Sequence, residues 1–275
     1  MKILTQSKKK INIVPYDPEW PNIFKIHANE LKSVLKENCI DIYHVGSTSV
    51  PGLCAKPTVD IMCVVKNLSN INNVLKNIGY EPKGEFNLPL RLFFSRKQPN
   101  DINLHVVKEN SGEISWNLTF QNYLRNNSEA RELYAKTKLD LVNNNPDGFN
   151  IIENLFSEYT IKKGEIIRKI AKIAGFNSYR FVIISNYYEI ESYKKFMNIE
   201  NIDFSDKNTY HVCLCLGTEI VAVACVKFDI VNSVAVLKSI KSIDSKNKNI
   251  LIEKISEWVD FHNLKLEPNT KLMST

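Results

Sequence analysis

Residues 44–53 read HVGSTSVPGL and residues 56–61 read KPTVDI, and this stretch constrains the fold more than any other part of the chain. An apolar segment ends in a Gly-Ser turn, and a second apolar segment with one acidic residue, Asp60, follows shortly after it. The backbone N–H groups and hydroxyls of such a turn bind phosphate oxygens, and a carboxylate on a neighbouring strand binds a metal ion. The stretch therefore predicts a phosphate-binding turn beside a strand that bears an acidic side chain.

This arrangement resembles the active site of nucleotidyltransferases. Together with further segments, it makes the chain resemble the GrpB-like family of that superfamily over about residues 11–165. The resemblance implies a nucleotidyltransferase-like mixed sheet with flanking helices and a nucleotide or another phosphorylated small molecule as ligand. Transfer of a nucleotidyl group with Mg²⁺ or Mn²⁺ is the reaction of that superfamily. The further matching segments are 14–21 (VPYDPEWP), 91–94 (RLFF), 103–107 (NLHVV) and 120–125 (FQNYLR).

Length and composition set the wider frame. The 275 residues exceed one typical domain and the composition shifts after Gly175, which predicts two domains, 1–174 and 175–275. The chain has neither an apolar run of membrane-spanning length nor a hydrophobic signal core, so we expect a cytoplasmic protein. The net charge of +6 does not indicate a nucleic-acid partner, because Asn, Ile and Lys are abundant together, as genome base bias produces. The six cysteines form no Cys-x-x-Cys pair, and we expect buried free thiols.

Hydrophobic periodicity predicts an α+β fold, with a mixed sheet first and helices after it. Lys8, Lys9 and Lys10 are expected in a solvated N-terminal tail. For the first domain, the predicted strands are 11–14, 40–45, 59–65, 91–95 and 102–107, and the predicted helices are 17–35, 70–78, 113–126, 128–143 and 150–173.

The second domain resembles the front part of a GNAT acetyltransferase in the order of its elements. In such a fold a glycine-rich loop before a helix binds the pyrophosphate of acetyl-CoA, and the corresponding segment here is 246–251 (KNKNIL). It has no glycine, and Leu251 is expected to obstruct the phosphate path, so acetyl-CoA is unlikely as a cofactor. The elements predicted are strands at 181–185, 210–216, 220–228 and 234–240, helices at 189–197 and 249–262, and a fifth strand at 264–266.

Asp60 is the first candidate for catalysis. Nucleotidyl transfer uses two acidic residues that alternate on one strand face, usually with a third on a neighbouring strand. Here Thr58 stands at the first position, Asp60 at the second, and Met62 follows on the same face. Asp60 is therefore interpreted in two compatible ways: as a remaining metal-binding or substrate-orienting carboxylate, or as a buried acceptor that holds the Gly46–Ser49 turn in shape.

His105 is the second candidate, because it stands where the resemblance expects the third carboxylate. A His105–Asp60 pair across adjacent strands would bind metal or act as a general base, whereas an isolated histidine in an apolar strand is a core residue. The family usually shows His-x-His at this point, and Asn103 replaces the first histidine.

The candidate phosphate-binding groups surround these two residues. The turn supplies backbone N–H groups and hydroxyls, and Lys56 and Arg91 supply positive charge. The competing interpretations are a polar turn that caps the next element and lone surface charges. The candidate ligand-binding residues are Gly46, Ser47, Thr48, Ser49, Lys56 and Arg91.

Two other function classes compete with the phosphate-binding hypothesis. The missing acidic pair favours a catalytically inactive binding or scaffold protein. Acyl transfer by the second domain is the other alternative, and the absent glycines argue against it. That domain ends soon after its fifth strand, so a free strand edge is available for packing on the first domain or on a second chain.

Overall fold

The computed structural model describes residues 3–85, 87–152, 158–184 and 187–267, and it divides into two compact units. The first unit comprises the chain up to residue 86 together with 91–176. The second comprises 87–90 together with the chain from 177 onwards. The assignment of 87–90 to the second unit follows from its contacts there: Ile183 N donates to the carbonyl of Asn87 at 3.1 Å, and Leu88 and Leu90 join that unit's apolar clusters.

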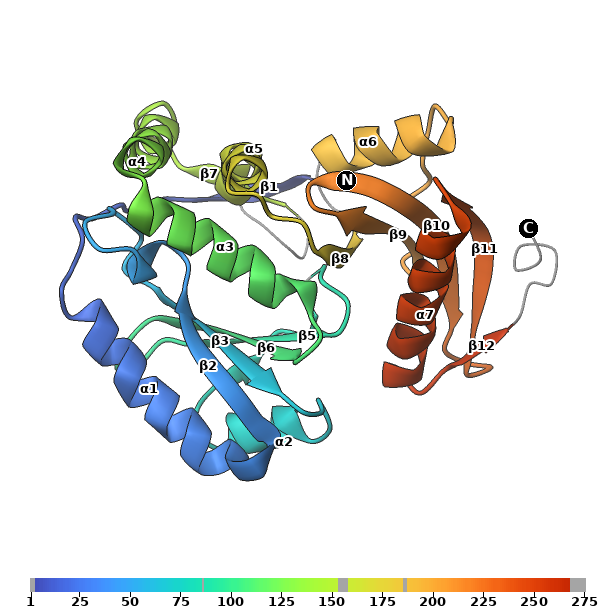
Figure 1. The fold of residues 1–275 in the computed structure, drawn as a ribbon, viewed down its shortest axis with the longest axis horizontal. Coiled ribbons are helices and arrows are strands. Elements are labelled where there is room, and N and C mark those ends of the chain that lie inside the picture. The colour runs from blue at the N-terminus through green and yellow to red at the C-terminus, as the bar shows by residue number, and fades with distance from the viewer. Residues whose placement is uncertain (1–2, 86, 153–157, 185–186, 268–275) are drawn as a thin grey trace. The chain divides into compact units, whose positions relative to one another are not determined.

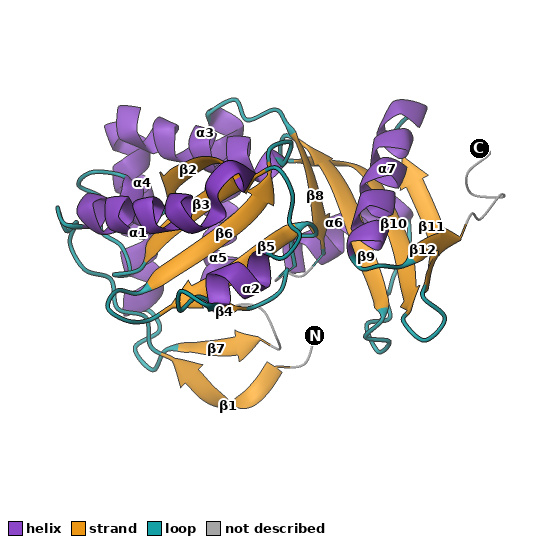
Figure 2. Ribbon diagram, turned by 90° about the horizontal axis from the view of Figure 1, so that it is seen from below, coloured by secondary structure: helices purple, strands orange, loops and turns teal. Residues whose placement is uncertain are grey.

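The first unit is built on a five-stranded mixed sheet in the order β2-β3-β6-β5-β4. β3 runs parallel to β6, and the other neighbours are antiparallel. Helices α1 and α2 lie on one face, α3 lies on the other, and α4 and α5 pack on α3 (Figures 1 and 2). The elements are β1 (Ile3–Lys9), α1 (Trp20–Leu35), β2 (Cys39–Val45), β3 (Val59–Val65), α2 (Ile71–Lys76), β4 (Glu81–Pro82), β5 (Arg91–Arg96), β6 (Ile102–Lys108), α3 (Gly112–Asn126), α4 (Ser128–Asn143), β7 (Phe149–Ile152) and α5 (Glu158–Ile173).

Strand β3 lies between β2 and β6 in this sheet, and every one of its residues except Asp60 is buried. A strand that helices cover on both faces reads as a nearly continuous apolar run, as VDIMCVV does. A carboxylate in such a strand destabilises the folded state unless it has polar partners. The groups around Asp60 are therefore expected to include such partners.

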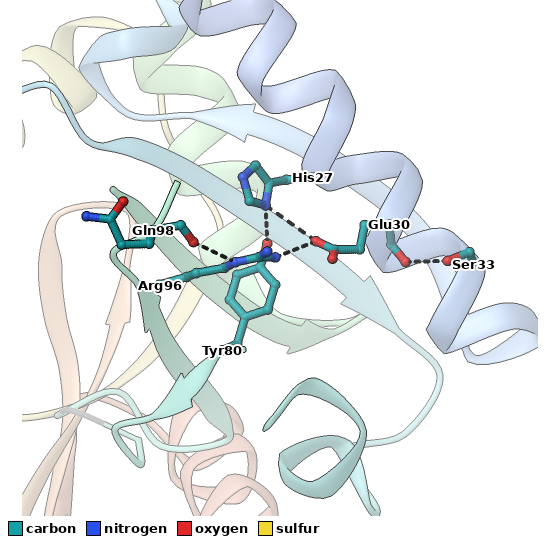
Figure 3. A network of polar contacts seen from close by, with 6 residues as sticks. All are labelled: His27, Glu30, Ser33, Tyr80, Arg96 and Gln98. Atoms are coloured by element: carbon teal, nitrogen blue, oxygen red, sulfur yellow. Dashed lines mark hydrogen bonds and ion pairs between the residues drawn. The ribbon is translucent and has the colours of Figure 1, made fainter. Parts of the chain in front are cut away.

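A polar network fastens α1 to the sheet on the face away from α3 (Figure 3). Arg96 on β5 donates to Glu30 at 2.6 Å and to the carbonyl of Gln98 at 3.1 Å. Its guanidinium also lies over the ring of Tyr80, whose hydroxyl is 2.7 Å from Nδ1 of buried His27. Burial, aided by the charge of Arg96, lowers the pKa of His27 and favours a neutral imidazole in this core.

Three expectations for the first unit are wrong. Residues 11–14 are not a strand, and Val14 makes only an isolated bridge to Ala55. The N-terminal strand is instead β1, which includes Lys8 and Lys9 and pairs antiparallel with β7. β7 occupies the start of the segment predicted as a helix over 150–173, and residues 153–157 lie outside the described part. The β1–β7 pair forms between strands that are distant in the sequence, so local periodicity does not predict it.

The second unit contains a five-stranded sheet in the order β12-β11-β10-β9-β8. Only the β11–β12 pair is parallel. Trp258 of α7 packs on one face of the sheet, with edge-on contacts to Tyr210 and His262 and a tilted contact to Phe228. No helix in the described part of either unit is long and apolar enough to cross a membrane. The elements are β8 (Tyr179–Ile183), α6 (Tyr187–Met197), β9 (Thr209–Leu216), β10 (Glu219–Asp229), β11 (Val234–Ser242), α7 (Ser245–Phe261) and β12 (Lys265–Glu267).

Candidate functional site

A cavity of about 180 Å³ lies in the first unit between the sheet and the helices α3, α4 and α5. It brings together four of the residues that the sequence indicates: Gly46 and Ser47 from the turn after β2, Asp60 from β3 and His105 from β6. Aromatic rings from α3 and α4 form its apolar wall. Its lining comprises Val45, Gly46, Ser47, Asp60, His105, Trp116, Asn117, Phe120, Tyr134, Lys163 and Ile167.

The turn after β2 is fixed by its own side chains. Ser47–Ser49 form one turn of 3-10 helix after Gly46. Thr48 Oγ1 is 3.0 Å from His44 Nε2, and Ser49 Oγ is 2.7 Å from the carbonyl oxygen of Gly46. Both Thr48 and Ser49 are buried and neither lines the cavity. Ser47 is therefore the hydroxyl of this turn that a ligand in the cavity would meet.

Asp60 packs directly against Gly46. Gly46 has φ +72°, and a Cβ at this position would overlap Asp60 Oδ2 and lie 3.0 Å from Asp60 Cγ. The turn thus needs glycine twice: for the left-handed backbone and for the close approach of the carboxylate.

The polar partner of Asp60 is Asn103 rather than a turn N–H. Asn103 stands opposite Asp60 in the β3–β6 register, and its Nδ2 donates to Asp60 Oδ1 at 2.8 Å. Burial raises the pKa of Asp60, while the Asn103 bond and the charges of Lys163 and Lys56 act in the opposite direction. Asn103, which stands where the resemblance expects a histidine, therefore holds the carboxylate in place.

His105 does not pair with Asp60. It stands opposite Met62 in the register, one pair of side chains further along the same face. Its Nδ1 accepts a hydrogen bond from Arg91 Nη1 at 3.2 Å, since an arginine can only donate. The expected His–Asp pair is replaced by a His–Arg contact, because the parallel register places Asn103 beside the carboxylate.

The guanidinium group of Arg91 makes its hydrogen bonds within the protein. Its Nε and Nη2 donate to the carbonyl oxygen of Glu85 at 3.2 and 2.8 Å, and its side chain is buried. It does not line the cavity. The structure therefore places Arg91 as the residue that orients the imidazole of His105, not as a phosphate clamp inside the cavity.

We expect His105 to remain neutral throughout the range in which an exposed histidine titrates, about pH 5 to 8. Burial, reinforced by the charge of Arg91, lowers its pKa from 6.5 to about 3. The folded state then binds fewer protons than the unfolded state between these values, so His105 destabilises the fold as the pH falls below 6.5. An NMR titration of the imidazole checks this, and a midpoint near pH 6 would contradict it.

Two buried or partly buried lysines of the site were not indicated by the sequence. Lys138 on α4 is 1% exposed; its Nζ donates to the carbonyl of Cys54 and, at 3.3 Å, to Ser47 Oγ. Lys163 on α5 lines the cavity itself, and Asp60 opposes the lowering of its pKa by burial. A usable signal does exist, because Lys138 and Lys163 each follow a buried tyrosine by four residues, which puts each lysine on the buried face of its helix.

Lys56 lies beside this cavity without lining it. Its Nζ is 5.3 Å from the ring centre of Tyr159. Burial, followed by the neighbouring charge of Lys163, lowers its pKa to about 8. The position of Lys56 fits the role of an additional positive charge close to Asp60.

The donor set does not fit a divalent metal. Asp60 is the only carboxylate among the residues that line the cavity, and one of its oxygens already accepts from Asn103. No group of three or more His, Cys, Asp or Glu side chains suited to a metal ion exists within the described ranges. Mg²⁺ and Mn²⁺ prefer several oxygen ligands, whereas lysines surround this carboxylate.

In the second unit, the segment predicted as a phosphate loop is helical. Residues 246–251 lie within α7, which begins at Ser245. The carboxylate of Asp244 caps this helix: Oδ1 accepts from Asn247 N at 2.7 Å and Oδ2 accepts from Asn247 Nδ2 at 2.8 Å. Leu251 is fully buried in the core and obstructs no phosphate path. An acidic side chain thus occupies the helix end that a pyrophosphate would need.

The chain was compared with known protein families, proteins and solved structures. The family model described as GrpB protein matches residues 10–172. A UPF0157 protein of Halalkalibacterium halodurans is 36% identical over 174 residues, which cover 60% of this chain and 83% of that protein. The protein YqkA of Bacillus subtilis is 31% identical over 52% of this chain and 43% of its own length. The crystal structure of GrpB from Enterococcus faecalis shares 34% identity with a TM-score of 0.52, covering 59% of this chain and 96% of that one.

Proposed function

This chain belongs to the GrpB family, and we propose that it binds a phosphorylated small molecule, nucleotides being the favoured class, with one phosphoryl group in the cavity of the first unit. The observation that carries this proposal is the excess of positive charge beside a hydroxyl-bearing turn. Ser47 and Lys163 both line the cavity, and Lys138 donates to Ser47. Charged groups of this kind are rarely buried without a counter-ion, and a phosphate supplies one.

The size of the cavity limits what enters it. Pockets for whole drug-sized ligands measure about 300–1,000 Å³. A cavity of about 180 Å³ accommodates only one end of a nucleotide. The phosphoryl end suits Ser47 and Lys163, and the remainder of the ligand lies outside the cavity in this proposal.

For the reaction, we favour binding without nucleotidyl transfer. The chain order of the turn, β3 and β6 supports a nucleotidyltransferase-like fold. The pair of carboxylates that nucleotidyl transfer needs is missing, since Thr58 precedes Asp60 on the same face. His105 presents a neutral imidazole held by Arg91. Asp60 and His105 then act as positioning and hydrogen-bonding groups for the ligand.

For the second unit, we propose a GNAT-like architecture without acyl transfer. Four antiparallel strands followed by a helix and a parallel fifth strand support the architecture. The Asp244 cap on α7 argues against a bound CoA pyrophosphate.

Calorimetric titration of the full chain with ATP and with inorganic phosphate tests the proposed ligand class. We expect saturable binding, weakened about tenfold or more in Lys163→Met, because a charge-assisted hydrogen bond contributes about 1.5–3 kcal/mol. Lys162→Met is the matched control: Lys162 precedes Lys163 on α5, is exposed and pairs with Glu158 at 2.9 Å. Equal affinity in the wild type and both variants, or no binding by the wild type, would overturn the proposal.

A further inference from the structure

Three lysines from three different elements converge on the Ser47–Asp60 corner of the cavity. Lys56 comes from the loop before β3, Lys138 from α4 and Lys163 from α5. Lys163 lines the cavity and Lys138 touches Ser47, while Lys56 and Lys163 each oppose the raised pKa of Asp60 through their charge. The site therefore collects cations that sequence spacing alone does not bring together.

Each ammonium group lies near the face of a tyrosine ring. Lys138 Nζ is 4.7 Å from the ring centre of Tyr134, and Lys56 and Lys163 are 5.3 and 5.7 Å from that of Tyr159. Cation–π contacts stabilise partly desolvated ammonium groups without neutralising them. A ring face cannot serve as a counter-ion, so the positive charge remains available to a bound anion.

Below about pH 7, where Lys138 is protonated as well, the charges at this corner sum to that of a divalent cation. Three ammonium groups, when protonated, and the one carboxylate of Asp60 give a net charge of +2. A phosphate at Ser47 would meet this charge where a metal-dependent enzyme holds its ion. Asp60 is tied to Asn103 and thus is a poor ligand for such an ion.

We propose that Lys56, Lys138 and Lys163 replace the divalent cation at this site, so that the chain binds phosphate groups in their metal-free form. This inference rests on the proposed function and goes further, because it names the ionic form of the ligand. Complexation by Mg²⁺ cancels two of the negative charges that the lysines attract, and the lysines would repel the added ion.

The test is calorimetry of the full chain with inorganic pyrophosphate, once in EDTA and once in excess Mg²⁺. We expect saturable binding in EDTA and lower affinity in Mg²⁺. The variant Lys138→Met/Lys163→Met should lose about 100-fold in EDTA, about a factor of ten for each charge-assisted hydrogen bond. Circular dichroism verifies that it is folded, and Lys163→Met alone serves if the double variant is not.

The outcomes separate the two proposals. Binding that requires Mg²⁺ would overturn the metal-free inference while leaving phosphate binding intact. A titration with Mn²⁺ alone that saturates in the wild type and is lost in Asp60→Asn would overturn the inference as well. Absence of pyrophosphate binding in both buffers would overturn both proposals together.

Discussion

Replacing Gly46 with alanine is expected to lower the free energy of unfolding of the first unit by about 2–6 kcal/mol. The backbone of Gly46, with φ +72° and ψ −170°, lies in a region that residues with a Cβ rarely adopt, and such strain costs about 1–3 kcal/mol. The new Cβ also overlaps the carboxylate of Asp60, which must move and give up its bond from Asn103. Loss of a partner by a partly buried carboxylate adds about 1–3 kcal/mol. Urea unfolding of the full chain, in which the transition of the first unit is followed, measures the total change in the free energy of unfolding.

Gly52→Ala is the matched control for this change. Gly52 also has a left-handed backbone, with φ +78°, but a Cβ there meets nothing within 4 Å. It should cost only the conformational part, about 1–2 kcal/mol. Equal destabilisation by the two variants would show that the contact between Gly46 and Asp60 is not tight, so that only the positive φ requires a glycine after β2.

Replacing Lys138 with methionine is expected to stabilise the fold while weakening phosphate binding. Burial lowers the pKa of Lys138 from 10.5 to about 7, so below that pH the folded state carries a buried ammonium. An apolar side chain of similar length removes the cost of desolvating this charge. The lost bond to the Cys54 carbonyl offsets part of the gain. Binding of ATP should weaken about tenfold because Ser47 loses its cationic neighbour.

The stability gain should depend on pH in a defined direction. The pKa of Lys138 is about 7 in the folded state and 10.5 when unperturbed, so between these values only the unfolded state binds the proton. Wild-type stability therefore rises with pH across this window, and the advantage of Lys138→Met should shrink from pH 6 to pH 9. Exposed Lys136, on the same helix, provides the control Lys136→Met, which should change neither stability nor binding. A Lys138→Met protein that is less stable than the wild type at pH 6 would contradict this account.

Local sequence patterns predicted the elements that form the floor of the site. β2, the Gly46–Ser49 turn and β3 follow from an apolar strand, a glycine and a second apolar run, all within a short segment. The α+β class and the antiparallel β5–β6 pair follow from the same kind of pattern. These features depend on neighbours in the chain, which is why periodicity and turn chemistry suffice.

The partners across the site could not be predicted in the same way. The β3–β6 register decides that Asn103, and not His105, meets Asp60, and a shift along the strand would have changed that choice. The carbonyl of Glu85 binds Arg91 through a loop whose path has no sequence signature. Lys138 and Lys163 each follow a tyrosine by four residues, but only the packing of α4 and α5 shows that those tyrosines are buried.

Phosphate binding in this cavity is tested most directly by a crystal structure of the full chain soaked with inorganic phosphate in the presence of EDTA. We predict anion density within hydrogen-bonding distance of Ser47 Oγ and Lys163 Nζ, with the bond between Asn103 and Asp60 unchanged. A cavity that stays without anion at saturating phosphate would contradict the account. So would a parallel soak with ATP and Mn²⁺ that places the metal on Asp60.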